Sequence, residues 1–508
     1  MHDSRSLGRP KSLVNPGFRR IAIALTIAVA VGCWGCGGGA SQSANNQPGN
    51  NQTPPPAAGS SNPVPTIQVL SPSCAPAGEP VQLLVIGPSN AGFVAGSVVR
   101  WNGSDRTTNS NGSINGLVAQ ISAKDVASAG TATVTVFNPA PGGGSSNPLT
   151  FTINSGAADP QSIAVDPAGK FAYVASEGCD AAGYLSMYTI NPTTGALASV
   201  GPPVPTNDEN TDYVTIDPSG KYAYVASSGN VWDIDSGSIL TFTINPTTGA
   251  LTSTTGGITA TGINGTPGFF NSVAVDPSGK FAYAGDGGAF PAGSFGGSAN
   301  VSMYTIDSTT GALTSVGMIA AEQPVSVAVD PSGKFAYAAN FNPNNVSMYT
   351  IDATTGTLAS IGTIAAGTAP NSVAVDPAGK FAYVANWTGY KTNGSVSMYT
   401  IDTTTGALTS IGSIAAGTSP YSVTVNPAGK FAYVANSGSN DVSMYTIDAT
   451  TGALTLIGTI ATQQFPTSIA IHPSGKFAYV TNSGSNRVSM YSIDATTGQL
   501  TLIGTIGT

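Results

Sequence analysis

Few side chains in this sequence are suited to acid–base, nucleophilic or metal chemistry. The only histidines are His2 and His472, and the body of the chain holds two isolated cysteines, Cys74 and Cys179. Neither a histidine-based nor a cysteine-based zinc site can be assembled from these residues. A single Cys74–Cys179 disulfide is one alternative, but two isolated cysteines form no disulfide framework, and we favour unpaired thiols. We therefore expect no metal and no cofactor.

Acidic residues occur in several loops of the C-terminal part of the chain. Loop carboxylates can bind calcium, but no EF-hand spacing is present, and solvated carboxylates are the preferred interpretation. The residues concerned are Asp180, Asp208, Glu209, Asp212, Asp233, Asp235 and Asp286.

Aromatic rings and amides share the same loops and offer a different chemistry. Exposed rings beside amides are suited to stacking on sugar rings or to gripping a protein, whereas the alternative is that these rings only pack their own loops. The predicted ligand-binding residues are Trp232, Asn340, Asn386, Trp387, Tyr390, Asn436 and Asn482. Further aromatic residues of these loops are Tyr184, Phe269, Phe270, Phe290, Phe295 and Phe341.

The composition excludes several classes of protein. The 508 residues are 41% hydrophobic and only 8% charged, which excludes a coiled coil and a charge-driven disordered chain. The formal net charge is −8, so no basic surface is available for nucleic acid.

The first residues predict export of the protein. Five basic residues precede an apolar run at residues 21–31. This arrangement suits a signal peptide, and the run is too short to span a bilayer. Ala30-Val31-Gly32-Cys33 resembles a bacterial lipobox, which implies that Cys33 is lipidated; Cys36 is a second candidate, and ordinary signal-peptidase cleavage is the alternative. We expect a lipoprotein-type signal peptide at 1–32, a flexible Gly-, Asn- and Pro-rich tether at 33–64, and a mature net charge of −12.

Residues 65–154 alternate apolar and polar residues in short runs separated by Gly, Pro or Asn, which predicts a small β-sandwich. The segments Ile67-Gln-Val-Leu-Ser-Pro-Ser, Pro76-Ala-Gly and Ala129-Gly-Thr-Ala-Thr-Val-Thr-Val resemble those of IPT/TIG immunoglobulin-like domains. That resemblance implies a spacer or contact module.

Residues 157–508 contain a sevenfold repeat. The turn Asp-Pro-(Ala/Ser)-Gly-Lys, with His or Asn replacing Asp in the last two copies, precedes an aromatic-Ala-Tyr strand. Each repeat is predicted to form four strands, and seven such repeats indicate a β-propeller. The fold class is therefore all-β, an Ig-like sandwich followed by a seven-bladed propeller of four-stranded blades, with blade 7 packing on blade 1. The repeated lysines are Lys170, Lys221, Lys280, Lys334, Lys380, Lys430 and Lys476, spaced 46–59 residues apart.

The repeats resemble YVTN/lactonase-type seven-bladed propellers, which include bacterial 6-phosphogluconolactonase. Tyr479-Val480-Thr481-Asn482 is the eponymous tetrapeptide. The family's Pro-Arg-His motif before an innermost strand is absent from all seven repeats, and only Glu177 matches its acidic position. His472 occupies the position of a turn aspartate, which predicts a structural role, and Arg487 is predicted to be solvated. Lactone opening needs a general base to activate water and a cationic group or donor to stabilise the oxyanion. Because the Arg and His of the family motif are missing, we expect the catalytic residues of a lactonase to be absent.

Loop lengths predict which rim of the propeller binds a partner. Insertions concentrate in the second-to-third loops and the fourth-to-first connections, which antiparallel order places on one rim. Two hypotheses follow. The first is an exported, lipid-anchored platform at the bacterial cell envelope (outer membrane or cell surface), or a secreted one, that binds an envelope glycan or protein as a monomer. The second is a divergent lactone hydrolase that uses Glu177.

Overall fold

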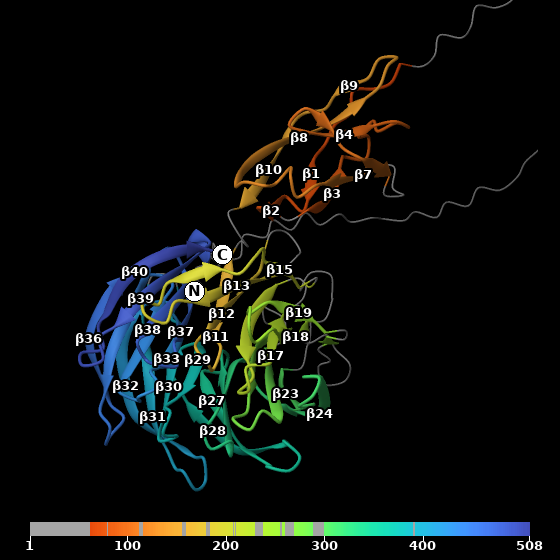
Figure 1. Ribbon diagram of the computed structural model, residues 1–508. Coiled ribbons are helices and arrows are strands. Elements are labelled where there is room, and N and C mark those ends of the chain that lie inside the picture. The colour runs from red at the N-terminus through yellow and green to blue at the C-terminus, as the bar shows by residue number, and fades with distance from the viewer. Residues whose placement is uncertain are drawn as a thin grey trace, which may run out of the picture.

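The computed structural model describes residues 61–78, 80–110, 115–154, 159–178, 183–206, 208, 210–228, 237–254, 257–259, 269–287, 299–389 and 392–508. These residues form two β-structured bodies, a sandwich drawn in red and orange and a propeller drawn from yellow to blue (Figure 1). No helix among them is long and apolar enough to cross a bilayer.

The sandwich consists of two sheets, with strand orders β1-β3-β7-β6 and β2-β10-β8-β4-β5, and β9 pairs with β8. Alternation along β3 buries Val81, Leu83 and Val85 while Gln82 is exposed. Trp101 of β4 and Phe151 of β10 pack with ring centroids 5.0 Å apart. Because β8 lies between these two strands, the two rings meet across it in the core. The strands are β1 (Val69–Ser71), β2 (Cys74–Pro76), β3 (Val81–Ile86), β4 (Val98–Trp101), β5 (Ser104–Asp105), β6 (Thr108–Ser110), β7 (Gly116–Ile121), β8 (Gly130–Asn138), β9 (Gly144–Ser145) and β10 (Leu149–Asn154).

Cys74 corrects one expectation from the sequence. It is disulfide-bonded, whereas we expected unpaired cysteines, and the other three cysteines of the chain lie outside the described residues. The position of Cys74 in space cannot be read from the sequence, because it depends on the parallel pairing of β2 with β10. This pairing places Cys74 opposite Thr152, two residues before the last strand of the sandwich ends. Sheet pairing thus brings Cys74 to the end of the sandwich from which the chain leaves for the propeller.

Seven sheets form the propeller, each with its first four strands in chain order, as predicted. In blades 1 and 2 the outer strand is divided into two short strands that both pair with the third strand. Blades 1 to 3 are β11 (Pro160–Val165), β12 (Phe171–Ser176), β13 (Tyr184–Ile190), β14 (Leu197–Ser199), β15 (Val204–Pro205); β16 (Thr211–Ile216), β17 (Tyr222–Ser227), β18 (Ser238–Ile244), β19 (Leu251–Ser253), β20 (Ile258–Thr259); and β21 (Phe270–Val275), β22 (Phe281–Asp286), β23 (Asn300–Ile306), β24 (Leu313–Ala320). Blades 4 to 7 are β25 (Pro324–Val329), β26 (Phe335–Asn340), β27 (Asn345–Ile351), β28 (Leu358–Ala365); β29 (Pro370–Val375), β30 (Phe381–Asn386), β31 (Asn393–Ile401), β32 (Leu408–Thr418); β33 (Pro420–Val425), β34 (Phe431–Asn436), β35 (Asp441–Ile447), β36 (Leu454–Ala461); and β37 (Pro466–Ile471), β38 (Phe477–Asn482), η3 (Ser483–Ser485), β39 (Arg487–Ile493), β40 (Leu500–Gly507).

The turn between the first two strands of a blade is held by its aspartate, as the repeat predicted. Asp376 Oδ1 accepts the backbone N–H groups of Lys380 at 2.6 Å and Phe381 at 2.7 Å. Gly379 closes the turn on the Asp376 carbonyl at 2.9 Å with φ of +67°, a conformation that favours glycine. The aspartates at this position are therefore structural.

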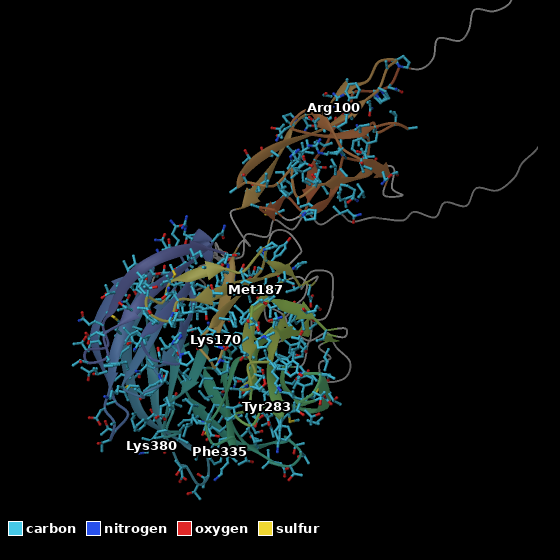
Figure 2. All side chains as sticks on the ribbon, viewed as in Figure 1. Arg100, Lys170, Met187, Tyr283, Phe335 and Lys380 are labelled. Carbon is cyan, nitrogen blue, oxygen red and sulfur yellow. The ribbon has the colours of Figure 1, made fainter. Side chains whose placement is uncertain are left out.

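Neighbouring blades are joined by one contact that recurs at all seven seams. The tyrosine of each second strand donates its hydroxyl to the glycine carbonyl in the last hairpin of the next blade, as Tyr383 does to Gly452 at 2.9 Å. The aromatic residue two positions earlier covers the same glycine, leaving no room for a side chain there. Figure 2 labels Phe335 and Tyr283, which make these two kinds of contact, and Met187, whose sulfur accepts the Leu251 N–H of the next blade at 3.3 Å. The large face of one blade thus meets the small face of the next, as predicted.

Ring closure uses the same contacts and no shared blade. Tyr479 of blade 7 donates to the Gly195 carbonyl of blade 1 at 3.0 Å, and Tyr188 donates to Gly507 of blade 7 at 2.8 Å. His472 adds a bond of its own: its Nδ1 accepts the Ser474 N–H at 3.0 Å, so Nε2 carries the proton and donates to the Gly169 carbonyl at 2.9 Å. His472 is 8% exposed and serves the structure, as its position in the turn predicted.

Candidate functional site

One rim of the central channel is organised by a strained residue that precedes the innermost strand. In six blades this residue is not glycine yet has a positive φ of 49° to 57°, a conformation that is uncommon for such residues. Its carbonyl accepts the N–H of the residue that follows the second strand, as in Glu177 to Asp159 at 3.1 Å and Trp387 to Ala369 at 2.9 Å. Glu177 and Trp387 therefore hold equivalent positions at the channel mouth. The six strained residues are Asp159, Asn210, Gln323, Ala369, Ser419 and Phe465.

Aromatic side chains gather on the part of the mouth formed by blades 4 to 7. Phe341 and Trp387, which follow the second strands of blades 4 and 5, pack with ring centroids 5.9 Å apart at 34°, and both are half-buried. Tyr421 in the innermost strand of blade 6 is 37% exposed, and its carbonyl accepts the Asn371 amide at 2.8 Å. Phe465 at the start of blade 7 is half-buried. The rings of Trp387 and Phe341 are thus partly exposed and pack against each other, and their contact with a ligand stays a prediction.

Carboxylates mark the other part of the mouth, in blades 1 and 2. Asp159 Oδ1 accepts the Gln161 amide at 3.0 Å, and Asp212 Oδ2 accepts the Ser228 N–H at 2.9 Å. Glu177 lies beside them on the rim and is half-buried. These groups can accept hydrogen bonds from ligand hydroxyls or ammonium groups.

The described cations of the propeller lie away from the mouth. The seven repeated lysines are exposed at the first hairpins, on the opposite rim; Figure 2 labels Lys170 and Lys380. Arg487 is exposed at the start of β39, the third strand of blade 7, and its Nη1 donates to Thr505 Oγ1 of β40 at 3.1 Å. Lys391 lies outside the described residues. The described part of the mouth is therefore acidic and aromatic.

The four asparagines predicted to contact a ligand lie behind the rim. Asn340, Asn386, Asn436 and Asn482 end the second strands of their blades and have no exposed surface. Their amide nitrogens bond inside the blade, as Asn436 Nδ2 does to Ser443 Oγ at 2.9 Å. Their predicted contact with a ligand stays a prediction.

Several other predicted residues have definite places. Phe269 and Phe270 are 4% and 0% exposed, so for these two rings packing within the protein is the correct interpretation. Asp286 is buried, and its Oδ1 accepts the Phe269 N–H at 2.8 Å. Among the described residues, no group of three or more His, Cys, Asp or Glu could hold a metal ion. The predicted residues outside the described ones are Cys33, Cys36, Cys179, Asp180, Glu209, Trp232, Asp233, Asp235, Phe290, Phe295 and Tyr390.

Two rings at the mouth were missed by reasoning from sequence, Tyr421 and Phe465. Their signal lies in the repeat itself, since both stand at positions whose residue type changes from blade to blade, beside a proline that is present in five of the seven repeats. The backbone contacts recur at these positions while the side chains vary, so the side chains are free to serve a binding surface.

Comparisons with known proteins agree with this architecture. The family profile described as "Lactonase, 7-bladed beta-propeller" matches residues 145–266, 258–374, 354–436 and 416–507. The search among curated proteins finds no match. The IPT/TIG resemblance of residues 65–154 stays a prediction.

Two solved structures show the same fold, and both are provisionally named 6-phosphogluconolactonases. The one from Bacteroides fragilis is 23% identical, covers 66% of this chain and 92% of its own, and has a TM-score of 0.52. The one from Bacteroides uniformis is 21% identical, covers 73% of this chain and 98% of its own, and has a TM-score of 0.53. At these identities the likeness extends to the fold alone.

Proposed function

The chain belongs to the lactonase family of seven-bladed β-propellers, and on that premise we propose that it uses the fold as a binding platform for a glycan at the bacterial cell envelope. The observation that carries this proposal is the pair of partly exposed rings, Phe341 and Trp387, which pack in a tilted arrangement at the channel mouth. Aromatic faces stack on the C–H face of a pyranose, and the nearby carboxylates accept hydrogen bonds from its hydroxyls.

The charge of the mouth selects among sugars. Asp159, Glu177 and Asp212 place carboxyl groups on this rim, whereas the seven repeated lysines lie at the first hairpins on the opposite rim. A phosphorylated sugar would bring its dianion close to these carboxyl groups, and like charges oppose binding. The proposed ligand is therefore a neutral glycan or one with amino groups.

Export and lipidation belong to the same proposal and rest on the leader. The basic residues, the short apolar run and Ala30-Val31-Gly32-Cys33 support attachment through diacylated Cys33. Metabolic labelling with a radioactive fatty acid in a bacterial host tests this directly. We expect label in the full chain and none in Cys33→Ala; equal labelling of both would overturn the assignment of Cys33, and label in neither would overturn lipidation.

Glycan binding is tested with the full chain on an array of neutral, amino and phosphorylated glycans, followed by calorimetry on the best binder. We expect Trp387→Ala to weaken binding about tenfold or more, because stacking on an aromatic ring contributes about 1–3 kcal/mol. Trp387→Phe should restore most of the affinity. Leu502→Ala is a matched control, since Leu502 is 51% exposed on the outer strand of blade 7. Absence of binding to every glycan, or wild-type affinity in Trp387→Ala, would refute the platform.

Lactone hydrolysis is the second candidate, favoured by the placement of Glu177. Its backbone N–H donates to the Asp159 carbonyl at 3.1 Å, which holds Glu177 at the rim, and a carboxylate there would serve as the general base that activates water. We expect no turnover of gluconolactone or its 6-phosphate above the uncatalysed rate. Turnover that disappears in Glu177→Gln would replace the platform by the hydrolase.

A further inference from the structure

Three loops without charged side chains lie at the end of the sandwich that is remote from the propeller. We call these loops, residues 61–64, 87–97 and 139–147, the tip, and none of them contains Asp, Glu, Lys or Arg. Figure 1 labels β9 in the tip, and the propeller lies beyond the opposite end of the sandwich. The tip takes no part in the channel mouth, so it goes beyond the glycan site proposed above.

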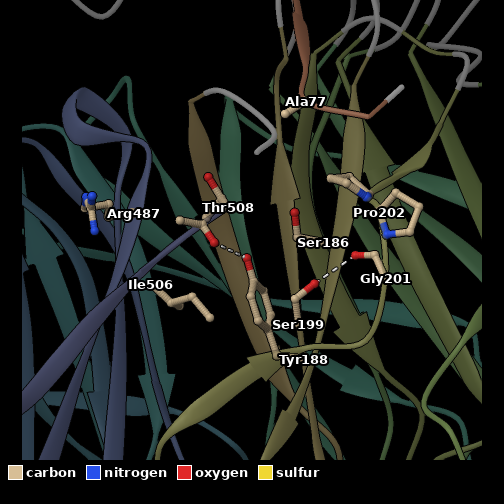
Figure 3. Close-up of a pocket in the computed structure, with 11 residues that line it drawn as sticks. Ala77, Ser186, Tyr188, Ser199, Gly201, Pro202, Arg487, Ile506 and Thr508 are labelled. Carbon is tan, nitrogen blue, oxygen red and sulfur yellow. Dashed lines mark hydrogen bonds between the residues drawn. The ribbon is translucent and has the colours of Figure 1, made fainter. Parts of the chain in front are cut away.

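The opposite end of the sandwich faces the propeller. There the chain leaves β10 after Asn154, and Ala77 lines a pocket together with residues of blades 1 and 7 (Figure 3). Strand β8 begins at this end, where Gly130 pairs with Ile153, and it ends at Asn138, directly before the third loop of the tip. The length of the sandwich thus separates the tip from the propeller.

One buried amide holds the loops of the tip together. Asn138 has no exposed surface, and its Nδ2 donates to the carbonyls of Pro63 at 2.8 Å and Gly92 at 2.7 Å. Its Oδ1 accepts the hydroxyl of Ser97 at 2.6 Å. Because Asn138 itself leads into the third loop, this single side chain fixes all three loops relative to one another.

The side chains that the tip presents to solvent are largely apolar. Val64 is 61% exposed, more than any other large hydrophobic side chain among the residues that the structure describes. Phe93 and Val94 are half-buried, and Ala140 and Pro141 are exposed. Exposure of apolar surface to water is unfavourable, and the hydrogen bonds of Asn138 hold the loop of Val64 in place. A fixed, exposed apolar surface of this kind is typical of an interaction site.

The course of the chain indicates what covers the tip. The described residues begin inside it at Ser61, and Asn62 holds the entering chain there, since its N–H donates to the Pro141 carbonyl and its carbonyl accepts the Gly143 N–H, both at 2.6 Å. Cys33, the proposed site of lipidation, stands 28 positions before Ser61. Such a length of chain spans at most about 100 Å. Of the two ends of the sandwich, the tip is therefore tied more closely to the bilayer.

The chemistry of the tip suits the interface of a bilayer. No charged side chain of the three loops has to leave water when the tip enters the boundary between head groups and acyl chains. Arg100 lies over the ring of Phe137 beside the tip, and its charge is paired with Asp105 at 2.7 Å. Valine and phenylalanine side chains gain free energy when they pass from water into the acyl boundary.

We propose that the tip inserts into the interface of the phospholipid bilayer to which Cys33 attaches the chain. Val64, Phe93 and Val94 enter the acyl boundary, and the sandwich then holds the propeller away from the bilayer. This inference rests on the lipidation proposed above, and the experiment separates the two.

The test uses the full chain purified from a bacterial host and reconstituted with phosphatidylcholine vesicles that contain a photoactivatable diazirine phospholipid. After irradiation, mass spectrometry maps the lipid adducts. We expect adducts on the tip at least about fivefold more often than on the outer strands that expose Leu456 and Leu502, which are 49% and 51% exposed. Val64→Asp should lower the adducts on the tip about fivefold and leave the thermal midpoint unchanged, because Val64 is exposed. Leu502→Asp is the matched control, expected to leave the adducts on the tip unchanged.

Three results would overturn the proposal: no adducts on the tip, adducts equally frequent on the outer strands, and an unchanged adduct yield in Val64→Asp. Fatty-acid labelling of the same protein tests the anchor separately. Label without adducts on the tip would retain the anchor and reject the contact, whereas adducts without label would retain the contact and reject the anchor. Chemical cross-links between the tips of two chains, in place of lipid adducts, would assign the tip to a second copy.

Discussion

The contact between Phe381 and Gly452 makes the seam between blades 5 and 6 sensitive to a single methyl group. Gly452 has φ of +73°, and a Cβ there would lie 2.3 Å from Phe381 Cδ1. Gly429, in the first hairpin of the same blade, has a similar φ of +66°, but its nearest Cβ contact would be Pro377 Cδ at 3.8 Å. Alanine at these two positions therefore separates the cost of the conformation from the cost of overlap.

The magnitudes follow from these two geometries. Alanine in the left-handed region costs about 1 kcal/mol at either position. At Gly452 the ring of Phe381, which is 5% exposed, must also move, and such overpacking costs about 1–3 kcal/mol. The bond from the Tyr383 hydroxyl to the Gly452 carbonyl then lengthens from 2.9 Å. We expect Gly452→Ala to lower the free energy of unfolding by about 3 kcal/mol and Gly429→Ala by about 1 kcal/mol.

Urea denaturation followed by circular dichroism measures this difference. At constant slope, the midpoint of the propeller transition should fall about three times as far in Gly452→Ala as in Gly429→Ala. Equal shifts in the two variants would refute the argument that the aromatic residue and the glycine lock adjacent blades, because only the left-handed conformation would then matter.

Three further predictions concern the seams and hairpins. Ala416→Thr should bring a hydroxyl to the unpartnered Asn436 Oδ1 and raise the free energy of unfolding by about 1 kcal/mol, measured by urea denaturation. The pKa of Asp448 is lowered by the backbone N–H groups and hydroxyl of the following threonines, so its stabilising effect is complete above the ordinary aspartate pKa and is lost as the pH falls through the lowered one. Asp448→Asn should therefore lose less stability than the wild type when acid is titrated below about pH 4. His472→Asn should remove the bond to the Gly169 carbonyl and lower the free energy of unfolding by about 1 kcal/mol, measured by thermal denaturation.

The repeat supplies the controls for these variants. Thr462 of the last connector already donates to Asn482 Oδ1 at 2.8 Å, so Thr462→Ala should cost about what Ala416→Thr gains. Asn245 holds the hairpin position of Asp448 in blade 2 and accepts the Thr247 N–H at 2.9 Å, which shows that asparagine fits there. Asn426 holds the position of His472 in blade 6. Unchanged stability in Thr462→Ala, an acid transition unaffected by Asp448→Asn, or an unchanged midpoint in His472→Asn would contradict the respective prediction.

The fold was predictable because the same pattern of apolar and polar residues recurs in all seven repeats. In the fifth repeat the second strand was predicted to begin at Phe381, where β30 begins. Alternation along that strand assigns Phe381 and Tyr383 to one face, and these rings pack on blade 6 while Ala382 and Val384 pack on blade 4. Because this pattern recurs at every seam, few arrangements of the blades other than a closed propeller are compatible with the sequence.

The site was less predictable because strand ends decide which polar groups reach the surface. Asn386 was assigned to a loop, yet β30 continues through it and turns its amide toward Ser397 at 3.0 Å. Its recurrence in four blades was itself the signal of a structural role, since a residue repeated around a ring serves every seam alike. Trp387 directly follows it, occurs at this position in one repeat only, and lies at the mouth.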